Sequence, residues 1–108
     1  PIVKSSFSCL GESKFLEKLE KINANDIILA GIESHVCVYQ TSYDLLQKNK
    51  HVEVVADSIS SRNINDHNTA IGRMKMDGAS LTSVEMLLFF LQKNASGDTF
   101  RKLVKLVK

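Results

Sequence analysis

Several residue types are scarce in this chain of 108 residues, and each scarcity excludes a class of protein. The chain has no tryptophan, one proline, five glycines and two cysteines, and it contains no low-complexity segment, internal repeat or linker. Two cysteines do not make the disulfide framework of a small secreted domain, so we expect a reducing compartment, the cytoplasm. The apolar run 86–91 is far shorter than the roughly 20 residues that span a bilayer, so no membrane partner is expected.

An excess of charge of one sign is also lacking. Fourteen lysines and arginines stand against twelve aspartates and glutamates, and the basic residues are scattered apart from the tail 101–108. This distribution gives no nucleic-acid footprint, and the tail lysines fit the solvated face of an amphipathic helix. With 44% hydrophobic and 24% charged residues, the composition is that of one soluble domain covering residues 1–108.

Hydrophobic periodicity predicts strands that alternate with helices. Helical spacing is present in residues 12–22, 38–48, 65–77, 83–91 and 98–107, and strand patterns are present in 27–31, 52–56 and 79–82. The run 27–31 is expected to be buried on both faces of a sheet, and 57–62 to form a polar loop. The alternation implies an α/β fold with a parallel sheet, in which ligands bind outside the carboxyl ends of the strands, near Cys37, Asp57 and Thr82.

Cys37 is the candidate reactive residue. It follows the apolar run 27–31 within one short turn, and a helical pattern begins next to it. A cysteine in the first turn of a helix meets unpaired backbone N–H groups and the positive end of the helix dipole, which favour the nucleophilic thiolate. The alternative is a small buried core residue, because free cysteine is among the most buried residue types. The pattern suggests a cysteine-centred enzyme and leaves this alternative open.

The other chemically capable residues show no pattern of their own. His35, His51 and His67 lack the spacing of metal ligands, so we expect no metal site. No glycine-rich phosphate loop or other cofactor motif is present, so we expect no cofactor. Cys9 has no partner at metal or redox spacing, and Asp57 is interpreted as a carboxylate that caps or orders the loop after its strand.

Three blocks of the sequence resemble, in order, the isochorismatase-like cysteine hydrolases. They are residues 31–38, 52–58 and 78–83, of which the first is the most specific. The resemblance covers essentially the whole chain and is closest to the isochorismatase domain-containing branch, where a lysine is followed by Phe-Ser as in residues 4–8. It implies a Rossmann-like three-layer αβα fold with a parallel sheet.

The resemblance also implies a catalytic triad of aspartate, lysine and cysteine. Carried over by position, Cys37 would be the nucleophile and Lys4 the triad lysine. The family's cis peptide bond would join Ile32 and Glu33, and the backbone N–H groups of Glu33 and Cys37 would form an oxyanion hole. The family's aspartate lies before the lysine, at the end of the first strand. We therefore expect a domain that is incomplete at its N-terminus and lacks the first strands, with the aspartate supplied by an upstream segment or by another chain.

The implied chemistry is acyl transfer on a small-molecule substrate. The aspartate would take the thiol proton, Cys37 would attack the carbonyl of a small amide-like or related substrate, and water would release the acyl enzyme. Cleavage of a vinyl ether, which the family also performs, stays open. So does a different class of function, a catalytically silent or truncated scaffold that serves as a binding or oligomerisation module. Family members commonly form dimers or tetramers, so a homo-oligomer is expected, with the apolar stripes of the last two helices as contacts.

Overall fold

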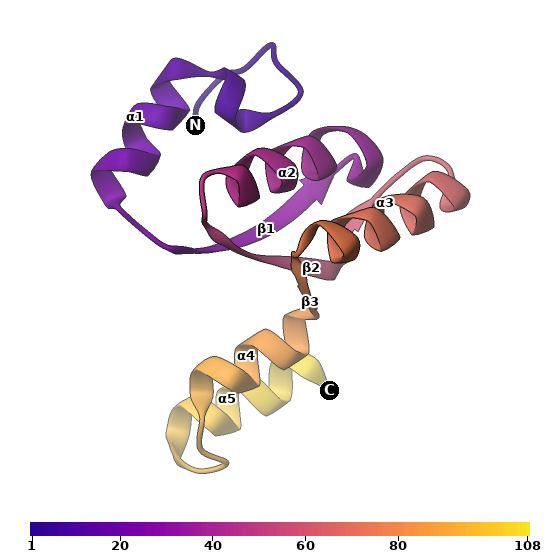
Figure 1. Ribbon diagram of the computed structural model, residues 1–108. Coiled ribbons are helices and arrows are strands. Elements are labelled where there is room, and N and C mark those ends of the chain that lie inside the picture. Colours follow the sequence, from indigo (N-terminus) through magenta and orange to yellow (C-terminus); the bar gives the residue numbers. More distant parts are fainter.

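The computed structural model describes residues 1–108 as one parallel sheet with helices around it (Figure 1). The elements are the 3-10 helix η1 (Cys9–Gly11), α1 (Ser13–Ile22), β1 (Asp26–Ile32), the π-helical turn η2 (Ser34–Val38), α2 (Tyr39–Gln47), β2 (His51–Ser60), α3 (Ile64–Asp77), β3 (Ser80–Thr82), α4 (Val84–Gln92) and α5 (Gly97–Val107). The three strands are parallel and lie in the order β1–β2–β3. The predicted α/β class with a parallel sheet flanked by helices is confirmed.

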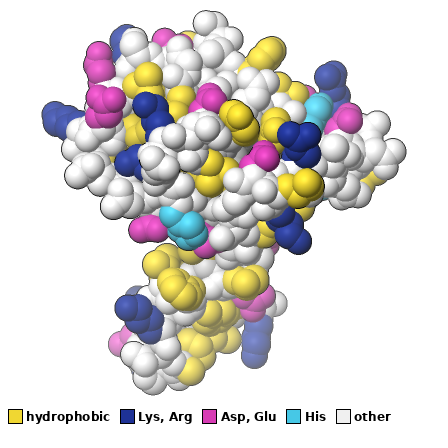
Figure 2. Space-filling model, in the orientation of Figure 1, with side chains coloured by type: hydrophobic (Ala, Val, Ile, Leu, Met, Phe, Trp, Pro, Cys, Tyr) yellow, Lys and Arg dark blue, Asp and Glu magenta, His cyan; other side chains and the backbone are white.

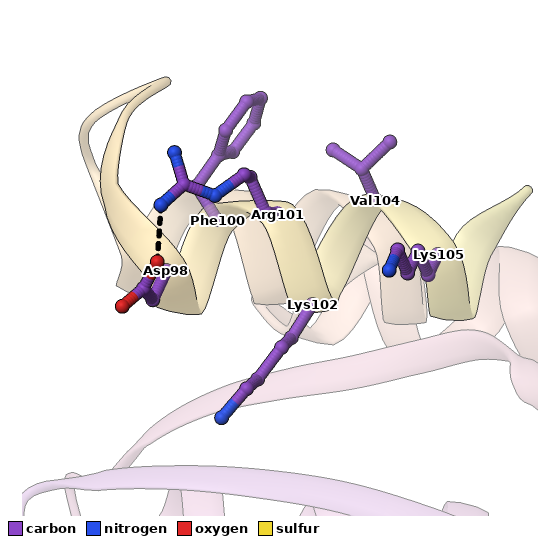
Figure 3. Close-up of a pocket in the computed structure, with 6 residues that line it drawn as sticks. All are labelled: Asp98, Phe100, Arg101, Lys102, Val104 and Lys105. Carbon is purple, nitrogen blue, oxygen red and sulfur yellow. Dashed lines mark hydrogen bonds and ion pairs between the residues drawn. The ribbon is translucent and has the colours of Figure 1, made fainter.

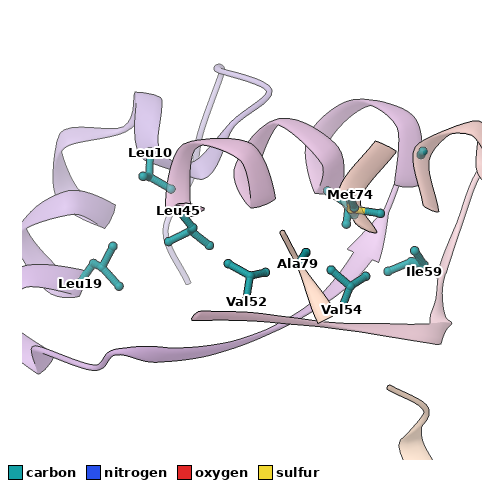
Figure 4. Close-up of a cluster of buried hydrophobic side chains, with 10 residues drawn as sticks. Leu10, Leu19, Leu45, Val52, Val54, Ile59, Met74 and Ala79 are labelled. Carbon is teal, nitrogen blue, oxygen red and sulfur yellow. The ribbon is translucent and has the colours of Figure 1, made fainter. Parts of the chain in front are cut away.

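The hydrophobic core lies between the sheet and the two helices α2 and α3, which cover the same face (Figures 1 and 4). Val52 and Val54 alternate along β2, so both side chains point to this face, and both are fully buried. Leu45 of α2 and Met74 of α3 are also fully buried and belong to the same cluster. The core therefore fixes α2 and α3 on the strand that runs through the middle of the sheet.

Truncation of Leu45 is expected to show how much of the stability depends on this core. Leu45→Ala removes a fully buried side chain and should lower the free energy of unfolding by about 2–5 kcal/mol, measured by urea denaturation. The matched control is Met76→Ala, because Met76 is 84% exposed on α3 and its truncation should change stability by less than about 0.5 kcal/mol. Equal losses in the two variants would contradict this description of the core.

The prediction that the first strand is buried on both faces is wrong. β1 lies at one edge of the sheet, and Ile28 and Ile32 are 52% and 72% exposed. Ile27 and Leu29 point the other way and pack against the core, because successive side chains of a strand face opposite sides. The Ile28 side of β1 is therefore largely exposed, and only the other side has the burial that the apolar pattern predicts for both.

The polar loop predicted at residues 57–62 is also corrected. β2 continues to Ser60, with Gly31 opposite Ile59 and Ile32 opposite Ser60 in the neighbouring strand. Ile59 is only 6% exposed, so one apolar side chain joins the core. Pairing with β1 outweighs the low strand propensity of the neighbouring serines and aspartate, since strand formation depends strongly on tertiary context.

The start of α4 is fixed by two side chains. The Ser83 hydroxyl accepts a hydrogen bond from the Met86 N–H at 3.1 Å, which is an N-cap. Asp57 lies within β2, and its carboxylate accepts from the Val84 N–H at 2.9 Å, so it caps the start of α4 rather than ordering a loop after its own strand. α4 and α5 then pack against each other and project away from the sheet (Figure 1). No helix combines the length and the apolar character needed to cross a membrane.

Candidate active site

The turn after β1 carries the candidate nucleophile. Gly31 has a φ of 128°, which favours glycine, and the peptide bond between Ile32 and Glu33 is cis. The Glu33 carbonyl accepts hydrogen bonds from the N–H groups of Val36 and Val38, at 3.1 Å each. Helical structure therefore begins at Ser34, earlier than the predicted start at residue 38. The candidate thiol of Cys37 lies inside this π-helical turn, at the carboxyl end of a parallel strand, where α/β folds bind ligands.

Lys4 and Cys37 lie side by side although 33 positions separate them. The Lys4 Nζ is 3.7 Å from the Cys37 Sγ. The same ammonium donates to the carbonyl oxygens of Ser6 and Phe7, at 2.9 Å each. These two hydrogen bonds hold the ammonium over the sulfur, and Cys37 is half-buried. Both residues proposed from the sequence are therefore in one place.

The segment that carries Lys4 is attached to α2. The Cys9 N–H, at the start of η1, donates to the Thr41 hydroxyl at 3.0 Å. Thr41 is nearly fully buried and stands one helical turn after Cys37. This contact anchors the N-terminal segment next to the turn that carries the thiol.

An ammonium beside a sulfur favours the thiolate, which is the nucleophilic form of cysteine. Attraction between unit charges about 4 Å apart is substantial wherever the surroundings are partly shielded from water. The turn also contains the backbone N–H groups of Glu33 and Cys37, the pair predicted for the oxyanion hole. The arrangement therefore places the sulfur beside an ammonium group, in a turn that carries these two backbone N–H groups.

No carboxylate of residues 1–108 forms an ion pair with Lys4. Asp26 contacts His51, Asp57 caps α4, and Asp66 lies 4.0 Å from the His35 ring. These three aspartates are engaged elsewhere in the fold, so Lys4 and Cys37 lie together without a carboxylate of residues 1–108 paired to the lysine. No group of three or more histidine, cysteine or acidic side chains is arranged to hold a metal ion.

Contacts from the β2–α3 connection are the part of the site that sequence reasoning missed. The Ser34 hydroxyl lies 2.9 Å from the His67 Nδ1, and the His35 Nδ1 lies 2.9 Å from the Ser61 hydroxyl. The Glu33 carboxylate accepts from the Arg62 N–H at 3.1 Å. From the sequence alone, the histidines are interpreted only as possible metal ligands. No spacing rule links residues 33–35 to 61–67.

A separate hollow on the molecule lies along α5 (Figure 3). Its lining consists of Asp98, Phe100, Arg101, Lys102, Val104 and Lys105. Arg101 is paired with Asp98 within the same helix. Because all six side chains come from one helix, the hollow has no opposing wall and offers no arrangement for chemistry.

The sequence model of the family described as "Isochorismatase domain" matches residues 1–86. The chain belongs to the isochorismatase family. It is 43% identical over 82 residues to the secreted isochorismatase effector Isc1 of Phytophthora sojae, covering 76% of this chain and 39% of that protein. It is 35% identical over 107 residues to isochorismatase domain-containing protein 2 of Danio rerio, covering 99% of this chain and 54% of that protein. The isochorismatase-family chain thus spans about half the length of these relatives.

Several solved structures share the fold of the chain. A MAR1 ribonuclease from Caenorhabditis elegans is 38% identical, with a TM-score of 0.84 over 96% of this chain and 53% of that one. The YcaC gene product of Escherichia coli, described as an octameric hydrolase of unknown specificity, has a TM-score of 0.86 at 20% identity over 94% and 50% of the two chains. The nicotinamidase/pyrazinamidase PncA of Bacillus subtilis has a TM-score of 0.71 at 23% identity over 74% and 44%. The last two likenesses show the fold alone.

Proposed function

We propose that this chain provides the nucleophile of a cysteine-dependent hydrolase that acts on a small amide-like or related substrate. The observation that carries the proposal is the 3.7 Å contact between the Lys4 Nζ and the Cys37 Sγ at the end of β1. The Cys37 thiolate attacks the substrate carbonyl carbon, and the Glu33 and Cys37 N–H groups stabilise the resulting oxyanion. The carbon–nitrogen bond then breaks and the amine leaves with a proton. Water cleaves the thioester, which releases the acid and the free enzyme.

We propose that the base that takes the thiol proton is a residue outside 1–108. The support is that no carboxylate of these residues pairs with Lys4. Residues 1–108 are then one part of a single hydrolase domain, completed by an upstream segment or by another chain. The same observation favours a second candidate function, a silent scaffold that binds without turnover, because a thiol with no base nearby turns over poorly.

Iodoacetamide labelling of the intact protein at pH 7 distinguishes the two candidates. The proposed hydrolase should label at Cys37 at least about tenfold faster than free cysteine, because a nearby cation raises the thiolate fraction. Cys9 is the internal control, since it is also half-buried but its sulfur makes no hydrogen bond with the Lys4 amine. Labelling is followed by mass spectrometry of the two cysteine peptides. A Cys37 rate equal to that of free cysteine would favour the silent scaffold.

A small-molecule substrate is proposed in preference to nucleic acid. The net charge is only +2 and the basic residues are scattered, whereas nucleic-acid sites are strongly basic. The similar C. elegans protein is nevertheless named a ribonuclease, so an RNA oligonucleotide belongs in the panel of substrates. We expect no cleavage of it.

Assembly into a homo-oligomer and a cytoplasmic location complete the proposal. Met86, Phe90 and Leu91 of α4 and Leu106 of α5 are each more than 60% exposed, and apolar side chains gather over these helices in Figure 2. Exposed apolar surface of this kind is typical of contacts between subunits. Both cysteines are free, which suits a reducing compartment.

A further inference from the structure

Three consecutive residues at the base of the nucleophile turn are each held by the segment 61–67. Glu33 is bound by Arg62, Ser34 by His67 and His35 by Ser61, as given above. The segment connects β2 to α3 and includes the first turn of that helix. The turn that carries Cys37 is thus attached along its first three residues to an element about thirty positions away in the sequence.

The three contacts differ in how far they are shielded from water. The hydrogen bond from the Arg62 backbone N–H to the Glu33 carboxylate is exposed, and the Arg62 side chain beside the same carboxylate is 83% exposed, so this pair of contacts contributes little. The His35 side chain is 24% exposed. Ser34 is fully buried, and the Nδ1 of the half-buried His67 is the partner of its hydroxyl. A buried hydroxyl that loses its partner keeps its full desolvation penalty, so the Ser34–His67 contact constrains the turn most strongly.

We propose that His67 is a positioning residue for Cys37. Its imidazole ring, carried on α3, fixes the Ser34 hydroxyl, and Ser34 is the first residue of the π-helical turn that contains the thiol. α3 packs against this turn and against α2, and its Met74 is fully buried, so the histidine projects from a rigid element. His67 thereby keeps the sulfur next to the Lys4 ammonium. The inference rests on the proposed role of Cys37 as a nucleophile.

Two substitutions of His67 distinguish the loss of its hydrogen bond from a change in the size of its side chain. His67→Leu removes the hydrogen-bonding nitrogen, whereas the side-chain amide of His67→Asn offers both an acceptor and a donor near the position of Nδ1. In the intact protein, the rate of Cys37 alkylation at pH 7 should fall about tenfold or more in His67→Leu, since small misplacements of reacting groups have large effects on rate. His67→Asn should return to within about threefold of the wild-type rate. The matched control is Asn68→Leu, an exposed neighbour on the same helix, which should react as the wild type does.

The route through Ser34 is tested by a double-mutant cycle. Ser34→Ala removes the same hydrogen bond from the other side, so the Ser34→Ala/His67→Leu pair should react no more slowly than the slower single variant. Multiplied effects in the pair would overturn the inference. The inference would also be overturned if Cys37 of the wild type reacted faster than free cysteine and His67→Leu reacted equally fast. It would be overturned as well if His67→Asn reacted as slowly as His67→Leu. A wild-type Cys37 that reacts only as free cysteine does would instead overturn the proposed function, and this inference with it.

Discussion

Replacement of Cys37 by serine is expected to lower kcat by on the order of 10⁴-fold or more in the intact protein, with the fold unchanged. The two side chains differ by one atom and the position is only half-buried, so packing is preserved. The chemistry is not preserved, because an alcohol does not ionise near neutral pH and the Lys4 ammonium at 3.7 Å has no thiolate to stabilise. Hydrolysis of a panel of small amides and esters, followed by release of the acid, provides the measurement.

The control for this substitution is Cys9→Ser. Cys9 is half-buried as well, and its hydrogen bond to Thr41 is made by the backbone N–H, which serine retains. We expect its kcat to stay within about threefold of the wild-type value, as for other small changes away from the reacting atoms. Substantial turnover by Cys37→Ser would show that the reaction does not pass through a sulfur-bound intermediate.

The position of Cys37 could be predicted because its determinants are local. An apolar run of strand length, Gly31 and the start of a helical pattern are adjacent in the sequence, and parallel strands place such a turn at the edge where ligands bind. The position of Lys4 has no local determinant. Only the resemblance to a family placed this lysine near the cysteine, and the structure brings the two residues within 3.7 Å.

The parts of the fold that the sequence did not predict depend on partners distant along the chain. β2 extends through Ser60 because β1 pairs with it, and no strand propensity in 57–60 indicates this. The Ile28 side of β1 is exposed because burial of a face requires a second layer packed against it. An apolar pattern in the strand indicates such a layer but contains no information about which residues form it. The contact between Ser34 and His67 joins two polar residues 33 positions apart, and a hydrophobicity pattern contains no information about such a pair.

Replacement of Lys4 by methionine is expected to slow the alkylation of Cys37 at pH 7 by about 10- to 30-fold. A positive charge within hydrogen-bonding distance stabilises the thiolate, and methionine fills similar space without that charge. An unassisted thiol ionises near pH 8.5, so raising the pH to about 9.5 should restore much of the rate that the variant loses at pH 7. Lys14→Met, at an exposed lysine of α1, is the matched control and should keep the wild-type rate at both pH values.

The pH dependence separates the two roles of the lysine. The Lys4 ammonium also ties down the carbonyl groups of Ser6 and Phe7, so methionine could disturb the N-terminal segment and the sulfur environment together. Loss of the charge alone leaves a thiol that hydroxide can still ionise, and its rate recovers at high pH. Loss of the local structure leaves a rate that stays low at every pH. A slow rate of Lys4→Met at pH 9.5 would therefore contradict an electrostatic role. An unchanged rate of the variant at pH 7 would show that the ammonium does not affect the reactivity of the sulfur.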